Sequence, residues 1–133
     1  MKTCITSVLI LATALSATVL SAASSNDTPA AYPTVKVTLH TSRGDDQITL
    51  GDTRERVRSL MDCPNQELSR DVWLYHGFSG DSKQANERGC RSMVITFTND
   101  RVAGMQFVNQ PAATAIAANL KLGRPARDVA STK

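Results

Sequence analysis

Two cysteines and two histidines in the body of this chain could act as nucleophiles, bases or metal ligands. Cys63, Cys90, His40 and His76 are scattered along the sequence, without the short spacing that metal ligands need. The serine-hydrolase, zinc-protease, phosphate-loop and dinucleotide-binding motifs are absent as well. The sequence therefore favours a protein that is not an enzyme, with no catalytic residue, no metal site and no cofactor.

The acidic pair Asp45-Asp46 does not change this prediction. Adjacent residues on a strand point to opposite sides, so the two carboxylates would not act together as acid and base. We expect them in a solvated turn, His40 exposed at a strand end, and His76 partly buried on the core side of its strand.

The first 23 residues have the pattern of a cleaved secretory signal peptide. Lys2 precedes an uncharged apolar run that closes on Ser21-Ala22-Ala23, and its strongly apolar part is too short for a membrane anchor. Ser24 follows, where a lipoprotein would carry its anchor cysteine. We therefore predict a periplasmic protein. Loss of Lys2 leaves 14 of the 15 basic residues against 12 acidic ones, a surplus too small to indicate a nucleic-acid partner.

Cys63 and Cys90 remain after the signal peptide is removed. In an oxidising compartment such an isolated pair typically forms one disulfide, and we predict that bond here. It would close a loop of about 28 residues, worth roughly 3.5 kcal/mol in the chain-entropy model.

The most regular stretch, "ITLGDTRERVRSLMDCP", predicts an amphipathic helix. Asp52 or Thr53 can cap its start, and Pro64 ends it. Its apolar stripe is bordered by arginines, notably Arg54 and Arg58. These arginines have two interpretations: their stems cover the core rim, with Arg58 paired to Asp62 in the next turn, or they contact an acidic partner or lipid head groups.

Period-two alternation predicts strands over 71–78, 90–98 and 102–108, joined as an antiparallel meander, with 34–40 as a possible fourth strand. A last helix is expected from Pro111 to Leu122. We expect the helix stripe Val57/Leu60/Met61 to cover a core face made of Val72, Leu74, Phe78, Met93, Ile95, Phe97, Ala103, Met105 and Phe107.

The predicted organisation is one α+β domain, residues 34–122, with helices packed on one side of a three- to four-stranded antiparallel meander sheet. A flexible leader, 24–33, precedes it and a loose tail, 123–133, follows it.

The opposite sheet face would then carry two aromatic side chains among polar ones, a composition enriched at protein interfaces. The alternative is that the last helix or another segment of the chain covers this face. On the first interpretation the predicted partner-binding residues are Trp73, Tyr75, Thr96, Thr98 and Gln106, together with Arg54 and Arg58.

The order of these signals is similar to the SmpA/OmlA (BamE) family of small bacterial envelope proteins. The likeness covers residues 48–108 and includes "VWLY" and "MVITFTNDRV" as well as the helix stretch. The matching positions are Gly51, Thr53, Val57, Pro64, Trp73, Tyr75, Phe97 and Val102.

This resemblance implies helices on one side of an antiparallel sheet, the arrangement of β-lactamase-inhibitor-like domains, which hold a protein partner on a sheet face. It also implies an accessory role in outer-membrane assembly or integrity, with a protein of the cell envelope as partner and peripheral contact with lipid or barrel proteins. The missing anchor cysteine departs from the family. A secreted inhibitor of a cell-wall or β-lactam-degrading hydrolase is the alternative.

Overall fold

The computed structural model describes residues 28–78 and 83–126, so the predicted signal peptide and most of the predicted tail lie outside the described residues. It confirms the α+β class. Its strands are β1 (Ala31–Thr34), β2 (Lys36–Thr41), β3 (Gly44–Thr49), β4 (Gln66–Ser69), β5 (Val72–His76), β6 (Ser92–Thr98) and β7 (Arg101–Val108). Its helices are α1 (Arg54–Met61), α2 (Lys83–Glu87) and α3 (Gln110–Lys121). Within the described ranges no helix is long and apolar enough to cross a membrane.

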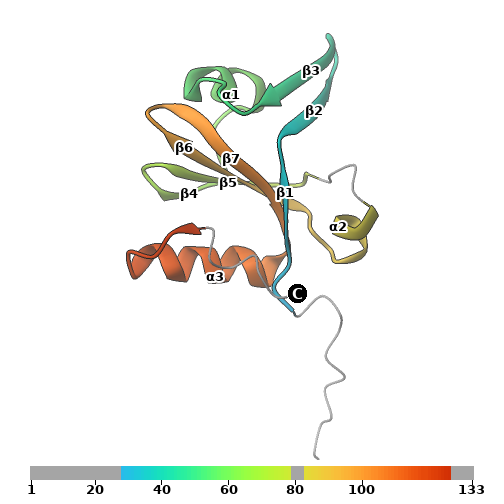
Figure 1. The fold of residues 1–133 in the computed structure, drawn as a ribbon. Helices are drawn as coiled ribbons and strands as arrows, with labels where there is room; N and C mark the ends of the chain where they lie inside the picture. Colours follow the sequence, from blue (N-terminus) through green and yellow to red (C-terminus); the bar gives the residue numbers. More distant parts are fainter. Residues whose placement is uncertain (1–27, 79–82, 127–133) are drawn as a thin grey trace, which may run out of the picture.

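Five strands form one antiparallel sheet in the order β1-β7-β6-β5-β4 (Figure 1). The predicted meander is its centre, and both edges come from segments that were not expected to be strands. β1 lies largely in the predicted leader, and Ala31 pairs with Val108 of β7. Pro33 is accepted there because an edge strand does not need every N–H. The sheet is therefore larger than the three to four strands predicted.

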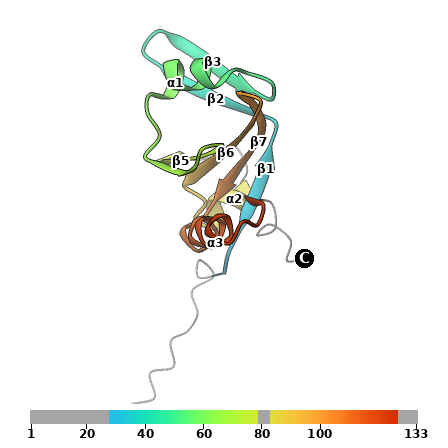
Figure 2. The same ribbon diagram turned by 90° about the vertical axis from the view of Figure 1, so that its left-hand side faces the viewer.

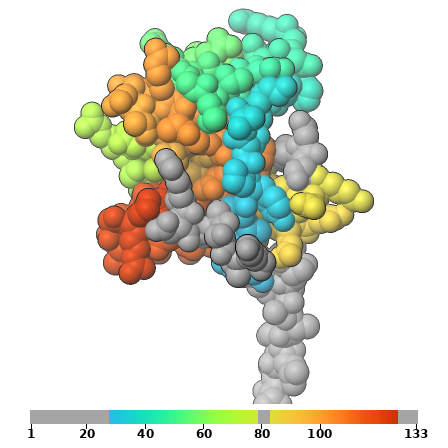
Figure 3. Space-filling model, in the orientation of Figure 1, coloured from blue at the N-terminus to red at the C-terminus, as the bar shows by residue number. Residues whose placement is uncertain are grey.

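The predicted fourth strand does not join this sheet. It forms β2, which pairs with β3 in a separate hairpin beside α1 (Figure 2). The space-filling view shows the hairpin and α1 next to each other (Figure 3). β3 includes Asp45 and Asp46, which were expected in a turn. The hairpin buries Val37, Leu39 and Ile48 in the same apolar cluster as Val57 of α1.

The main helices lie on opposite faces of the sheet, so the prediction that they share one side is wrong (Figure 1). α1 and the hairpin cover one face, and α3 packs Ile116 on the other, against Val72, Leu74, Val94 and Val108. Strands β5 and β6 carry apolar side chains in both directions, and each face must be shielded from water.

Helix α3 begins at a cap that also holds the edge strand. The side-chain oxygen of buried Asn109 accepts hydrogen bonds from the N–H groups of Ala112 in α3 and of Ala30 before β1. Its amide nitrogen donates to the carbonyl of Thr28 at 2.7 Å. One side chain therefore connects the helix start to the strand that completes the sheet.

The β6–β7 hairpin turns at Asn99 and Asp100, whose φ angles are 51° and 59°. Two positive φ values are those of a type I′ turn, which matches the twist of paired strands. Beyond the turn the register shifts: Phe97 pairs with Val102 but Thr96 pairs with Gly104, which leaves Ala103 as a bulge. Val102 is therefore buried on the α1 face, where Ala103 was expected.

Candidate functional site

The two aromatic residues predicted to bind a partner are buried. Trp73 is 1% exposed and Tyr75 is 2% exposed, both in the core beneath α1 and the hairpin. Trp73 pairs across the strands with Ile95, and its ring meets that of Phe97 edge-on at 4.7 Å. The prediction of an exposed aromatic docking surface is therefore wrong. Strand β5 is apolar on both sides, so its alternation did not indicate which side meets α1.

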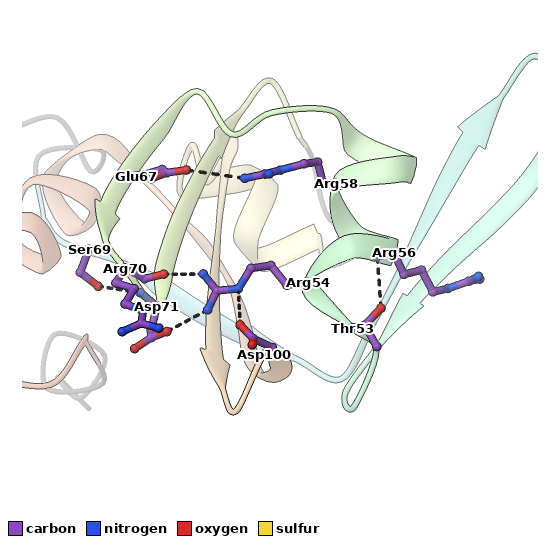
Figure 4. A network of polar contacts seen from close by, with 9 residues as sticks. All are labelled: Thr53, Arg54, Arg56, Arg58, Glu67, Ser69, Arg70, Asp71 and Asp100. Atoms are coloured by element: carbon purple, nitrogen blue, oxygen red, sulfur yellow. Dashed lines mark hydrogen bonds and ion pairs between the residues drawn. The ribbon is translucent and has the colours of Figure 1, made fainter.

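Arg54 lies at the rim of this core, and its guanidinium group contacts Arg70, Asp71 and Asp100 (Figure 4). Its Nη1 donates to the carbonyl of Arg70 at 2.6 Å, and its Nη2 donates to the Asp71 carboxylate at 2.8 Å. Its Nε lies 3.1 Å from the Asp100 carboxylate as an ion pair, without the alignment of a hydrogen bond. The group also lies over the Phe97 ring, 4.6 Å from its centre.

Arg58 is more exposed and covers the indole from the next turn of α1. Its guanidinium carbon lies 5.1 Å from the Trp73 ring centre. Its acidic neighbour is Glu67 of β4, at 3.9 Å, rather than the Asp62 suggested by helical spacing. A hollow of about 610 Å³ beside these side chains is lined by three arginines and two carboxylates, with Thr53 and Asn99. Because charges of both signs face each other there, the contacts support the interpretation that the arginines cover the core rim.

The predicted disulfide is absent, because Cys63 and Cys90 are both free thiols. Cys63 is exposed after α1. Cys90 is buried before β6, and its thiol faces the carbonyl of Ala30 at 3.6 Å. Burial raises the pKa of the Cys90 thiol.

Each histidine has one polar side-chain partner, and the two partners differ in kind. His40 lies 2.8 Å from the Asp45 carboxylate on the exposed hairpin, and His76 lies 2.9 Å from the hydroxyl of Ser92. His76 is exposed rather than partly buried as predicted. His40 thus has a carboxylate partner and His76 has a hydroxyl partner. A hydrolytic triad needs a carboxylate, an imidazole and a hydroxyl together, and neither pair contains all three. Within the described ranges no group of three or more His, Cys, Asp or Glu could hold a metal ion.

Two other predicted binding residues, Thr96 and Gln106, do meet at a concave surface. They lie on the α3 face of the sheet: Thr96 pairs with Gly104 across β6 and β7, and Gln106 follows Gly104 by two residues on β7. We call this concavity the sheet groove. It has a volume of about 620 Å³ and is lined by Pro33, Thr34, Val35, Leu50, Thr96, Ala103, Gly104, Met105, Gln106 and Ala126. Thr98 is exposed and lies outside it.

The sheet groove is neutral and has an apolar rim. None of the ten described residues that line it is charged, although 20% of the residues in the chain are. Val35 is 69% exposed and Leu50 is 45% exposed, and the N–H of Leu50 donates to the carbonyl of Val35 at 3.3 Å. Val35 and Leu50 are thus two large, exposed apolar residues that lie close together in the lining of the sheet groove. Sequence analysis missed both, because Val35 fell within the possible strand 34–40 and Leu50 within the stretch that predicted the amphipathic helix.

The floor of the sheet groove has room and unused hydrogen-bonding capacity. A Cβ atom built on Gly104 meets no other atom of the described residues within 4 Å. Of the hydrogen bonds made within the described part of the chain, none involves the side chain of Thr96 or of Gln106. A glycine inside a strand and a neighbouring bulge are both features found where a ligand or a second backbone approaches closely.

Comparison with known proteins gives this chain no relative. No family model, no curated protein and no solved structure matches it. The resemblance to the SmpA/OmlA (BamE) family therefore stays a prediction from the sequence, and function has to be argued from the site.

Proposed function

We propose that the chain is a non-catalytic, protein-binding module of the bacterial cell envelope, located in the periplasm after removal of a signal peptide. The sheet groove carries this proposal. Paired exposed apolar residues beside a concave, mostly apolar surface are typical of interaction sites, because isolated domains rarely leave such area in contact with water. The family resemblance supports the same kind of role, as an accessory to outer-membrane assembly or integrity.

The partner surface is thus displaced from the position that the sequence suggested. Thr96 and Gln106 keep their proposed role, whereas Trp73 and Tyr75 lie in the core. Arg54 engages Asp71 and Asp100, so its charge is not offered to a partner or to lipid head groups.

Cross-linking in cells tests the proposal. A photoreactive amino acid in place of Gln106 should give a discrete adduct with an envelope protein, which mass spectrometry would identify. Val35→Ser and Leu50→Ser should each reduce the adduct severalfold. Leu122→Ser is the matched control, because Leu122 is 70% exposed, like Val35, but lies outside the sheet groove. Absence of an adduct, or equal loss in the control, would count against the proposal.

The hairpin supports a second candidate, an inhibitor of a secreted hydrolase. β2 and β3 lie apart from the main sheet and project beyond it (Figures 1 and 2), with exposed residues at the tip. Such a projection can enter the cleft of an enzyme. Adding the protein to a panel of cell-wall and β-lactam-degrading hydrolases tests this. Inhibition that is lost on Arg43→Ala at the tip would support it, and no inhibition of any enzyme would remove it.

A further inference from the structure

We propose that the sheet groove takes an extended, uncharged peptide segment of its partner, with one apolar side chain over Gly104. This inference rests on the proposed function and names the chemistry of its ligand. The first reason is charge. Because none of the described residues that line it could pair with a buried charge, a charged segment would lose its hydration without compensation from them.

The second reason is the unused polar groups of the floor. Thr96 pairs with Gly104 across the strands and Gln106 follows it on β7. The Thr96 hydroxyl and the Gln106 amide have no partner among the hydrogen bonds of the described residues. A peptide backbone offers one donor and one acceptor per residue, so it satisfies such groups. An acyl chain would cover them and leave them unpaired, and buried polar groups without a partner disfavour binding.

The third reason is the shape of the site. Gly104 leaves a gap at the centre of the floor, and the volume of about 620 Å³ lies within the range of about 300–1,000 Å³ that ligand pockets occupy. That space suits a few side chains and not a folded domain. Val35 and Leu50 at the rim would lie along the segment as it enters.

Gly104 also provides a substitution that fills the site with little cost to the fold. Its φ angle is outside the left-handed region, and an added Cβ enters open space. Gly104→Leu should therefore occupy the gap, and its thermal unfolding midpoint should stay within a few degrees of that of the parent chain. Thr98→Leu is the matched control, because it adds a leucine to an exposed strand position outside the sheet groove.

The experiment is selection of a displayed heptapeptide library on the immobilised full chain. Enriched peptides should be uncharged at their central positions and carry Val, Ile or Leu there. Binding of their synthetic versions, measured by fluorescence anisotropy, should weaken by at least about tenfold in Gly104→Leu and less than about twofold in Thr98→Leu. The proposal is overturned by enrichment of charged peptides, by absence of enrichment, or by equal binding to Gly104→Leu.

A dodecyl-chain detergent below its micellar concentration is the competing probe. Little displacement of the peptide supports the proposal, and full displacement at equal concentration would point to an alkyl ligand and overturn it. The two proposals can fail separately. An adduct at position 106 without peptide binding would leave the binding function in place, with a folded surface as ligand. Peptide binding without an adduct would support the peptide ligand and count against an envelope partner in cells.

Discussion

The guanidinium carbon of Arg54 lies 5.4 Å from the centre of the Trp73 ring, and the two groups close the rim of the core under α1. Arg54 is the first residue of its helix, and its backbone N–H donates to the carbonyl of Asp100 in the β6–β7 turn. The same residue thus fixes the helix to the sheet through its backbone and shields the indole with its side chain.

Arg54→Ala should lower the free energy of unfolding by about 2 kcal/mol. The substitution removes two charge-assisted hydrogen bonds and a cation–π contact, and it exposes the edge of the indole. Arg54→Lys should restore only a minor part, since an ammonium group cannot reproduce the planar fork. Urea unfolding followed by tryptophan fluorescence measures this. Arg56→Ala, at a half-exposed neighbour, should cost less than about 0.5 kcal/mol, and an equal loss there would contradict the special role of Arg54.

Asn109→Ala should destabilise the fold by about 2–3 kcal/mol, because it removes the α3 cap and leaves two backbone groups near β1 without their partner. Hydrogen exchange should speed up most at the amide of Ala30. Thr114→Ala, on the exposed side of α3, is the control and should change little. Unchanged protection at Ala30 would show that Asn109 does not hold the edge strand.

Alkaline pH should destabilise the protein through Tyr75. Burial raises the pKa of Tyr75 to about 12 from 10.0, with the nearby Cys63, Asp62 and Glu67 adding to the shift and Arg58 opposing it. The native state therefore keeps a proton that the unfolded state releases. The resulting stability is full below pH 10 and falls as pH rises toward 12, by about 1.5 kcal/mol at pH 11.

Tyr75→Phe isolates this effect. At pH 8 it should cost about 1 kcal/mol, from the lost hydrogen bond of the hydroxyl to the carbonyl of Asp62. Between pH 9 and 11 its free energy of unfolding should fall less steeply than that of the parent chain, as measured by urea unfolding at each pH. Parallel pH profiles would contradict the assignment.

The thiols should react at very different rates. Exposed Cys63 should be alkylated by a maleimide within minutes, whereas Cys90 should react only as the protein unfolds, because it is buried and its pKa is raised. Peptide mapping by mass spectrometry, with and without urea, reads each site. Protection of both cysteines until a reductant is added would instead reveal the disulfide that the sequence predicted.

The parts of the fold that sequence predicts well are those determined by local chemistry. Thr53 caps α1 through a hydrogen bond from the N–H of Arg56, and α3 starts beside Pro111, as their types and positions indicated. The meander of β5, β6 and β7 follows in the same way from its alternation and its Asn-Asp turn. These signals are read within a few residues of the chain.

The wrong predictions concern features that depend on contacts between residues far apart in the sequence. Trp73 and Leu74 are both buried, so alternation along β5 separates two sides without saying which one faces α1. Only the register with Ile95 resolves that choice. Whether two cysteines form a disulfide likewise depends on where the fold places them. The prediction rested on the oxidising compartment alone, which says nothing about the distance between the two thiols. The sheet groove was predicted in part. Thr96 and Gln106 were expected to bind a partner, but the place of Val35 at the rim depends on the hairpin, which the sequence did not predict.

The pairing of Ala31 with Val108 has a consequence for how the molecule reaches its native state. β1 is the first of the described strands and its partner β7 is the last, so β1 can take its place in the sheet only once β7 is available. The closing contact spans most of the domain, so it carries a high loop entropy and slows the final assembly. An unfolded chain must therefore keep this early segment from aggregating until β7 is free to pair with it.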